Sequence, residues 1–296
     1  MARRALVLGG GGPVGIAWEA GLLAGLAEGG IDFSEADLIV GTSAGAFVGA
    51  QIAMGRAAGD IANAIIAEQA RARPAAVGGH PRPSDPMALV RKMQEAALSG
   101  RDAEAVRRDI GAFALSAETM DEASFIASFG RSFRGLADDF WPDRPFACTA
   151  TDALSGAFVL WDRAAKVGLA RAVASSCSLP GIFPPITIRG RRYIDGGMHS
   201  GWIADITKEQ DIVVVVAMRT MGGDPAFVER MRHGREAEIS NLRKAGVRVE
   251  LVVPNSASMA AVGDNTHDPR VRPAAARAGL DQGRAAAAEL GGLWGS

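Results

Sequence analysis

The sequence predicts an α/β fold with a parallel-rich central sheet flanked by helices. Three observations support this prediction. Apolar runs of strand length alternate with helical patterns along the first 70 residues, strands return from about residue 145, and the runs are continuous. Continuous apolar runs are typical of strands covered on both faces, and strand–helix alternation is typical of parallel sheets. We therefore expect a single domain over residues 1–296.

The first 70 residues contain two strand–helix units. The segment RALVLGG (4–10) reads as a buried strand, and apolar residues from Ile16 to Leu26 follow at helical spacing. The segment ADLIVGTSAGAFVGAQIAMG (36–55) adds a second strand, a tight glycine-flanked turn and a second helix. A unit of this kind favours parallel pairing of its two strands.

A helical insertion interrupts the alternation at 71–141. It opens with a loop rich in Pro, Gly and Arg, and its apolar spacing predicts helices near 86–98, 102–114 and 117–134. We expect this segment to be an insertion in the same domain, or a lid over its site.

The remainder of the chain returns to strand and helix patterns. A proline-rich turn, LPGIFPP, separates a helix from a strand pair that ends in YIDGG. The predicted elements are strands at 145–154 and 156–162, a helix over 164–177, the strand pair in 186–197, a strand at 211–217, a helix over 225–245, a strand in 247–254 and a helix near 270–290.

The composition argues against several classes of protein. Lys and Arg number 32 against 33 Asp and Glu, so the chain lacks the basic excess typical of nucleic-acid binding. Its two cysteines, Cys148 and Cys177, offer no disulfide framework, and its four scattered histidines show no metal-ligand spacing. No apolar run has the length of a transmembrane helix. We expect a cytoplasmic protein with no metal, no cofactor and no nucleic-acid partner.

The segment GTSAG (41–45) fits the G-x-S-x-G pattern. Ser43 lies between an apolar strand and an apolar helix, where a sharp turn lifts the hydroxyl clear of the backbone. Gly41 and Gly45 leave room for a substrate, and the start of the helix offers N–H groups beside Ser43. Ser43 is therefore the candidate nucleophile, with a simple helix N-cap as the alternative.

Four consecutive glycines end the first strand, and residues 10–15 fit the G-x-G-x-x-G pattern of dinucleotide-binding proteins. The backbone of Gly10, Gly11 and Gly12 can approach a ligand closely because no side chain intervenes. At the carboxyl end of a parallel strand, their N–H groups would face an oxyanion formed during acyl transfer. We favour this second interpretation of the loop.

The segment RYIDGG places Asp195 after a short strand and before Gly196 and Gly197. A hydrolytic serine needs a base that takes its proton, and flanking glycines would let the Asp195 carboxylate reach Ser43. An Asp-Gly turn between two strands of a hairpin is the alternative interpretation.

Four segments, in order along the chain, resemble the patatin-like phospholipase family. They are GGGGPVG (9–15), GTSAGA (41–46), ASSCSLPGIFPP (174–185) and YIDGG (193–197). The resemblance covers the first 70 residues and the region from about 145 to 200, whereas 71–141 and the C-terminal third carry no family motif. It implies a three-layer α/β/α fold and an enzyme that hydrolyses acyl esters of lipids without a cofactor.

The resemblance also implies roles for single residues. Ser43 would be the nucleophile and Asp195 the general base of a Ser-Asp dyad without a catalytic histidine. The glycine loop would form the oxyanion hole for an acyl-serine pathway. Three residues of the ASSCSLPGIFPP segment would line the site: Pro180, Phe183 and Pro185. The motif glycines that support these turns are Gly15, Gly41, Gly45, Gly196 and Gly197.

Two positions depart from the family pattern. The family loop often carries Arg or Lys just before its last glycine, where this chain has Val14. A cation there could hold a phosphate head group, so its absence weakens a phospholipid assignment and leaves ester hydrolysis untouched. The family often has an Asn and a Pro shortly after the aspartate, where this chain has Gly201 and Ile203.

Two other functions stay open from the sequence. A Ser-His-Asp esterase could use His267 with Asp195 or Asp211, in the chain order of α/β-hydrolases. A nucleotide-binding protein would need an acidic residue after the second strand, but Asp32 and Asp37 both precede it. The sequence also leaves open the oligomeric state and a transient contact with a membrane surface.

Overall fold

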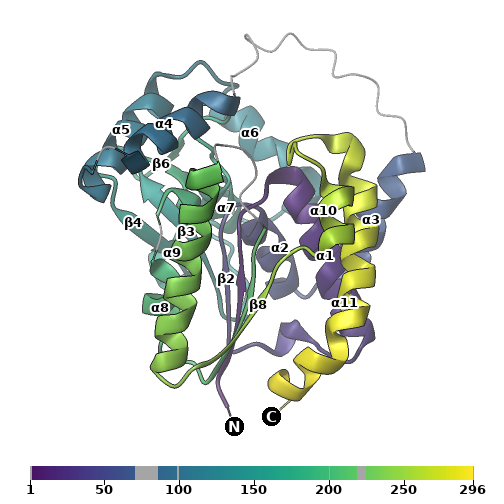
Figure 1. Ribbon diagram of the computed structural model, residues 1–296. Coiled ribbons are helices and arrows are strands. Elements are labelled where there is room, and N and C mark those ends of the chain that lie inside the picture. Colours follow the sequence, from purple (N-terminus) through teal and green to yellow (C-terminus); the bar gives the residue numbers. More distant parts are fainter. Residues whose placement is uncertain (1, 71–85, 99, 200, 219–224, 296) are drawn as a thin grey trace.

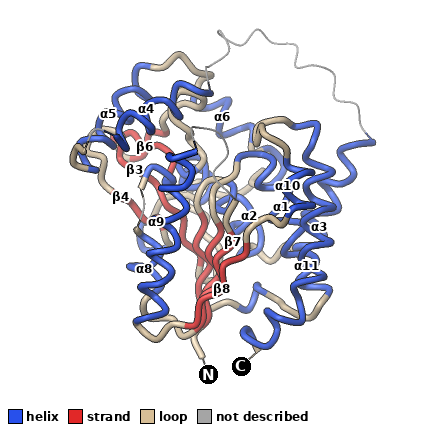
Figure 2. Tube along the Cα trace, in the orientation of Figure 1, coloured by secondary structure: helices blue, strands red, loops and turns tan. Residues whose placement is uncertain are grey.

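The computed structural model describes residues 2–70, 86–98, 100–199, 201–218 and 225–295. Its centre is an eight-stranded sheet that has helices on both faces (Figures 1 and 2). The strands are β1 (Arg4–Leu8), β2 (Leu38–Gly41), β3 (Phe146–Asp152), β4 (Phe158–Trp161), β5 (Ile186–Ile188), β6 (Arg191–Asp195), β7 (Ile212–Val216) and β8 (Arg248–Val252). The predicted three-layer α/β/α architecture is therefore confirmed.

The strand order is β5-β6-β3-β2-β1-β7-β8, and β4 pairs with β3. Strands β3, β2, β1, β7 and β8 pair in parallel, whereas the β3/β4, β3/β6 and β5/β6 pairs are antiparallel. The sheet is mixed and mostly parallel, as the strand–helix alternation predicts.

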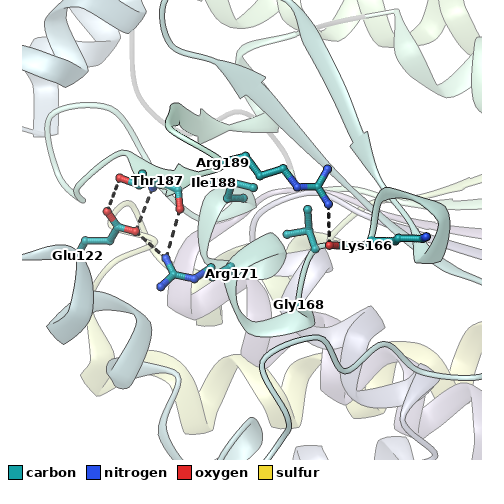
Figure 3. A pocket seen from close by; sticks show the side chains of 8 residues that line it. Glu122, Lys166, Gly168, Arg171, Thr187, Ile188 and Arg189 are labelled. Atoms are coloured by element: carbon teal, nitrogen blue, oxygen red, sulfur yellow. Dashed lines mark hydrogen bonds and ion pairs between the residues drawn. The ribbon is translucent and has the colours of Figure 1, made fainter.

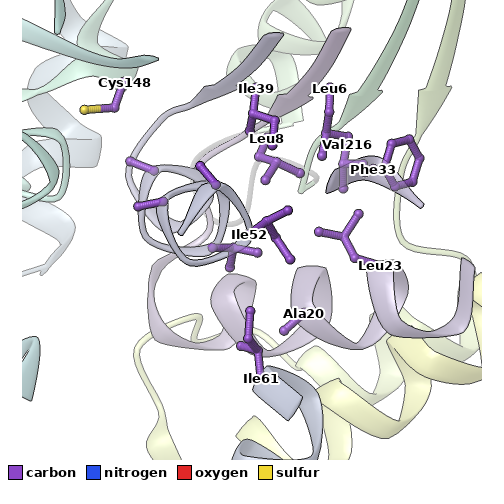
Figure 4. Close-up of a cluster of buried hydrophobic side chains, with 14 of the residues drawn as sticks. Leu6, Leu8, Ala20, Leu23, Phe33, Ile39, Ile52, Ile61, Cys148 and Val216 are labelled. Carbon is purple, nitrogen blue, oxygen red and sulfur yellow. The ribbon is translucent and has the colours of Figure 1, made fainter. Parts of the chain in front are cut away.

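The alternation of side chains along β1 explains why helices cover both faces. Figure 4 shows Leu6 and Leu8 of β1 gathered with Ile39 of β2, Leu23 and Ile52 in one buried cluster. The intervening residues of β1 belong to a second buried cluster on the opposite face. A strand buried on both sides is apolar throughout, which is the continuous run seen in the sequence.

The helices divide between the faces accordingly. The first cluster takes side chains from α1 (Gly12–Glu28), α2 (Ala44–Ala53), α3 (Ala58–Ile66), α6 (Glu122–Ser128), α7 (Leu169–Ser176), α10 (Ser256–Val262) and α11 (Arg272–Trp294). The second takes them from α8 (Trp202–Thr207) and α9 (Pro225–Lys244). Helices α4 (Pro86–Leu98) and α5 (Ala103–Ser116) share a third, smaller cluster with Ile194 of β6.

The insertion differs in part from its prediction. Its opening loop lies outside the described residues, and the helices predicted near 86–98 and 102–114 are α4 and α5. The third helix is much shorter than 117–134. Helix α6 begins only after Asp121, whose carboxylate accepts the Ser124 N–H at 2.8 Å, and soon after it Gly130 adopts a positive φ of 55°. A capping carboxylate and a left-handed glycine limit a helix from both ends.

Two other differences concern short helices. The helix predicted over 164–177 begins at Leu169, because Lys166 adopts a left-handed φ of 50° and Gly168 has an extended conformation at the N-cap. Helices α8 and α10 are absent from the prediction, since each spans fewer than two turns of periodic sequence.

Candidate active site

Strand pairing on β3 brings Ser43 and Asp195 into one region. Cys148 of β3 pairs with Gly41 of β2, and Ala150, two residues on, pairs with Asp195 of β6. Both residues of β3 also pair with β4, so β2 and β6 share the remaining edge of β3. Strand β2 is parallel to β3 and β6 is antiparallel, so their C-terminal ends meet there. Two residues along a strand span about 7 Å, so β2 delivers Ser43 close to Asp195.

Ser43 occupies a strained turn between β2 and α2. Its φ of 54° and ψ of −115° are rare for a residue with a side chain. The Ser176 hydroxyl accepts the Ser43 N–H at 2.9 Å, and the Cys177 thiol donates to the Ser43 carbonyl at 3.1 Å. In the described part of the chain, the Ser43 side chain makes no capping bond to α2. Within these residues Ser43 therefore does not act as a side-chain N-cap of α2.

Gly41 and Gly45 flank Ser43. Both must be glycine because the backbones of β1, β2 and α2 approach one another closely at this turn. A Cβ atom added at Gly45 would lie 2.3 Å from the carbonyl oxygen of Leu8, and one at Gly41 would lie 2.4 Å from the Cα of Ala46. Distances below 3 Å cannot be accommodated without moving the backbone. The same packing that seats α2 against β1 therefore sets the Ser43 turn.

Asp195 is buried at the end of β6. Its side chain is 2% exposed, and its Oδ1 accepts the Gly197 N–H at 2.8 Å. Burial raises the pKa of Asp195 to about 6, against the opposing effects of the Gly197 N–H and the Ser43 hydroxyl. The Asp-Gly sequence does not form the hairpin turn, which lies instead at Arg189 and Gly190, both with positive φ.

The glycine loop lies directly against Ser43. A Cβ atom added at Gly10 would be 3.5 Å from the Cβ of Ser43. The carbonyl of Gly9 accepts the Gly45 N–H at 2.9 Å, which ties the loop to the start of α2. Among the described residues, the N–H groups of Gly10, Gly11 and Gly12 donate to no protein acceptor. Three available donors beside a strained serine are suited to stabilising an oxyanion.

A cavity of about 700 Å³ opens above Ser43, Asp195 and the glycine loop. The rings of Phe125 and Phe183 stack in its wall with centroids 4.5 Å apart. Phe47 and Phe129 extend the same aromatic wall. Phe125 lies in α6 and Phe129 directly follows it, so the described part of the insertion forms part of the cavity.

The three residues expected to line the site are not equivalent. Phe183 lines the cavity, whereas Pro180 and Pro185 are buried and lie outside its lining. The physical reason is that the proline-rich turn packs against the hairpin. The carbonyl of Pro185 accepts two N–H groups from Arg192, at 2.8 and 3.2 Å.

The C-terminal third supplies cavity residues that sequence reasoning did not identify. Met231 and Arg235 of α9 line the cavity, as does Arg272, which pairs with Glu68 at 3.1 Å. Met231 and Arg235 lie one helical turn apart, but both are far from Arg272 and from the motifs in the sequence, and none of the three belongs to a motif. Their convergence depends on where α9 and α11 pack.

His267 also lies in the cavity, but not as the triad alternative requires. A Cβ atom added at Gly12 would lie 3.3 Å from its Nε2, so the imidazole rests on the glycine loop. Burial lowers the pKa of His267. Within the described residues no ion pair joins His267 to a carboxylate. Asp211 lies at the opposite end of the sheet, where it accepts the N–H of Arg3 at 2.7 Å.

The acidic residues weighed for nucleotide binding lie at the wrong end of the sheet. Asp37 accepts the N–H of Arg4 at 2.7 Å, at the start of β1. Asp32 caps a short turn through the Ser34 N–H. Neither approaches the glycine loop, which follows the carboxyl end of β1. Neither Asp32 nor Asp37 is therefore placed to bind a ribose beside this loop.

A second pocket, of about 480 Å³, lies between α6 and the β5–β6 hairpin (Figure 3). Arg171 donates to Glu122 at 3.0 Å, and Glu122 in turn accepts the Thr187 hydroxyl at 2.8 Å. Arg189 donates to the carbonyls of Ala165 and Lys166, each at 2.8 Å. These bonds connect the hairpin to its neighbours, so the charges serve the packing of this region.

Among the described residues, no three His, Cys, Asp or Glu side chains gather into a metal site. No helix in that part of the chain is both long and apolar enough to cross a membrane.

Comparison with solved structures finds two larger proteins. VipD from Legionella pneumophila shares 13% identity at a TM-score of 0.48, over 98% of this chain and 67% of VipD. The type III effector protein ExoU shares 17% identity at a TM-score of 0.42, over 96% of this chain and 52% of ExoU. The chain thus spans about two thirds of one and half of the other.

Comparison at the level of sequence gives a family assignment. No curated protein matches the chain. A sequence model of one family, described as patatin-like phospholipase, matches residues 6–206. This range includes the glycine loop, Ser43, the aromatic wall and Asp195, so the chain belongs to the patatin-like phospholipase family.

Proposed function

We propose that this lipid hydrolase cleaves carboxylic esters of lipids with a catalytic dyad of Ser43 and Asp195. The observation that carries the proposal is the meeting of β2 and β6 on one edge of β3, which brings a buried carboxyl to a strained serine. The glycine loop adds N–H donors on the same side. A nucleophile, a base and an oxyanion site are the three groups that acyl transfer needs.

The reaction would proceed in two halves. At neutral pH the Asp195 carboxyl, with its pKa near 6, is mostly ionised and takes the proton of Ser43 as the hydroxyl oxygen attacks the ester carbonyl. The N–H groups of Gly10, Gly11 and Gly12 stabilise the tetrahedral oxyanion. Asp195 then returns the proton to the leaving alcohol, and the acyl group stays on Ser43.

Hydrolysis of the acyl-serine would use the same groups in reverse. Asp195 takes a proton from water, which attacks the acyl carbonyl, and the proton returns to Ser43 as the fatty acid leaves. The aromatic wall formed by Phe47, Phe125 and Phe129 offers an apolar surface for the acyl chain. No cofactor takes part in any of these steps.

The experiment is hydrolysis of p-nitrophenyl esters of several chain lengths by four proteins: wild type, Ser43→Ala, Asp195→Asn and His267→Ala. We expect the first two variants to lose about 10⁴-fold or more in kcat, as when members of a catalytic unit are removed. His267→Ala should lose less than about tenfold, because a neutral imidazole without a carboxylate partner is not a triad base. Thermal unfolding of each variant checks that its fold is intact.

The outcomes separate the proposal from its alternatives. An equal loss of kcat in His267→Ala, with its fold intact, would favour a Ser-His-Asp triad over the dyad. Full activity in Ser43→Ala would remove the nucleophile assignment. A wild type inactive on every ester would count against hydrolysis altogether. A burst of p-nitrophenol that matches the enzyme concentration would support the acyl-serine intermediate.

A further inference from the structure

The end of α7 and the two residues after it contact both proposed catalytic residues. The Ser176 hydroxyl accepts the Ser43 N–H at 2.9 Å, and the Cys177 thiol donates to the Ser43 carbonyl at 3.1 Å. The Ser178 carbonyl accepts the Asp195 N–H at 3.0 Å. Three consecutive residues thus hold the backbones of the serine and the aspartate, and we refer to them as the connecting segment.

The bonds to Ser43 act on a strained turn. A φ of 54° with a ψ of −115° persists only where the surrounding structure holds it. The Ser43 carbonyl has a second partner, because it also accepts the Phe47 N–H at 3.2 Å. In the described part of the chain, the Ser43 N–H donates only to the Ser176 hydroxyl. Loss of that hydroxyl would leave the N–H without a protein acceptor and would allow the turn to relax.

The connecting segment is itself fixed in the core. Ser176 and Ser178 are fully buried, and the Ser178 hydroxyl donates to the Pro184 carbonyl at 2.5 Å. Ser175, the residue before the segment, is also fully buried. Its hydroxyl accepts the Trp161 Nε1–H at 3.0 Å and donates to a carbonyl of α7 at 2.7 Å. Ser175 and Ser176 are therefore adjacent buried hydroxyls, of which the second binds the nucleophile turn.

We infer that the connecting segment positions the dyad, with Ser176 as the main positioning residue, by holding the Ser43 turn where the serine hydroxyl reaches the Asp195 carboxylate. The inference rests on the proposed function, because it assumes that Ser43 and Asp195 act together. It goes further by giving a role to residues that exchange neither a proton nor an acyl group. Strand β3 brings the two catalytic residues to one edge of the sheet, and the segment sets their final geometry.

The first test compares Ser176→Ala with the matched control Ser175→Ala. Each variant removes one buried hydroxyl of α7, and thermal unfolding measures the stability that each loses. The activity readout is the single-turnover cleavage of a p-nitrophenyl ester at increasing enzyme concentration, which separates substrate binding from the chemical step. We expect the saturating rate to fall roughly 10- to 100-fold in Ser176→Ala, with half-saturation unchanged, because the nucleophile is misplaced. Ser175→Ala should keep the wild-type rate.

A second pair of variants tests the bond to the Ser43 carbonyl. Cys177→Ser keeps a hydrogen-bond donor of similar size, whereas Cys177→Ala removes it. The loss should be smaller than in Ser176→Ala, because the Ser43 carbonyl keeps the Phe47 N–H. We expect the saturating rate to fall roughly three- to tenfold in Cys177→Ala, and Cys177→Ser to recover most of that loss.

The pH dependence supplies a readout that a purely structural role would not move. The Ser43 hydroxyl lowers the pKa of Asp195, since a hydrogen bond to the carboxylate favours its ionised form. A relaxed turn withdraws this hydroxyl. The apparent pKa in kcat/KM should therefore rise above its wild-type value near 6 in Ser176→Ala and stay near that value in Ser175→Ala.

The outcomes separate this inference from the function beneath it. Equal losses of rate in Ser176→Ala and Ser175→Ala would assign the effect to the packing of α7 and overturn the inference. So would a wild-type rate and a wild-type pKa in a folded Ser176→Ala. If Ser176→Ala does not fold, the Cys177 pair decides: recovery in Cys177→Ser supports the inference, and equal rates in both variants overturn it. A wild type inactive on every ester would overturn the inference and the dyad together.

Discussion

Two clusters of glycine bring backbones into contact in this protein, and they serve different ends. One cluster lies at the ends of β1, β2 and β6 and surrounds Ser43. The other lies between α1 and α11, where added Cβ atoms at Gly25 and Gly283 would approach backbone oxygens to 2.1 and 2.2 Å. The first cluster lines a cavity, and its Gly10, Gly11 and Gly12 N–H groups have no acceptor among the described residues. The second is buried in packed helices.

The comparison teaches that close approach alone does not mark a functional glycine. Gly45 and Gly25 would clash equally badly with an added Cβ atom. The difference is what lies beside them: Ser43 lies two residues before Gly45, whereas the atoms nearest to a Cβ at Gly25 belong to α11. A substitution between α1 and α11 should therefore affect stability, whereas one at Gly10, where an added Cβ atom makes only ordinary contact beside Ser43, should affect turnover.

The largest effect is expected in the helix–helix cluster. Gly25→Val would force α1 and α11 apart, since the new side chain would overlap the Leu280 carbonyl. We expect a loss of about 4 kcal/mol in the free energy of unfolding, because neither backbone can yield without disrupting the core. Urea unfolding measures the loss, and activity per folded molecule should stay near that of the wild type.

Helix α11 provides a matched control for this prediction. A Cβ atom added at Gly291 would meet nothing within 4 Å. Gly291→Ala should therefore stabilise the protein by roughly 0.5–1 kcal/mol, through the lower helix propensity of glycine. A Gly25→Val variant as stable as Gly291→Ala would mean that the two helices do not pack as closely as described.

The next largest effect is expected on turnover, from a substitution in the glycine cluster around Ser43. Gly10 has no positive φ, and an added Cβ atom would make only ordinary contact with Ser43, so Gly10→Ala should fold normally. Its methyl group would occupy space that the ester carbonyl needs. We expect kcat/KM to fall about 100-fold, close to 3 kcal/mol, with the unfolding free energy nearly unchanged. Normal turnover in Gly10→Ala would show that the glycine loop does not form the oxyanion site.

The third and smallest effect concerns Asp195→Asn, which should increase the free energy of unfolding at neutral and higher pH. The pKa of Asp195 is about 6 in the folded protein against 3.8 for an unperturbed group, so folding disfavours its ionisation. The protein therefore loses stability as pH rises from about 4 through 6. Asp195→Asn should unfold much like the wild type at pH 4 and be more stable by roughly 2–3 kcal/mol at pH 8. If the wild type and Asp195→Asn were equally stable at each of the two pH values, the result would contradict the burial of Asp195.

Much of the fold could be predicted from the sequence, because its strands are buried on both faces. After Arg4 the run in β1 is apolar, β7 is apolar throughout, and the turns around Ser43 and Asp195 carry glycine motifs. The bounds of α6 were wrong, since Asp121 and Gly130 act as local stops that override the apolar spacing. Here capping chemistry decided the helix length rather than periodicity.

The cavity could be predicted only in part. Ser43, Asp195 and the glycine loop lie next to strand ends, so topology alone brings them to one edge of the sheet. Arg235 and His267 depend on the packing of α9 and on the loop after α10, which no local pattern encodes. The mutual approach of α1 and α11 was likewise missed, because glycines spaced along a helix read in sequence as weak helix formers.

The measurement that tests the central claim most directly is the pH dependence of kcat/KM for a p-nitrophenyl ester, in the wild type and in His267→Ala. If Asp195 is the base, the rate rises with an apparent pKa near 6 in both proteins, because the His267 imidazole plays no part in that titration. A rate independent of pH between about 5 and 8, or a rise that disappears in His267→Ala, would contradict the account.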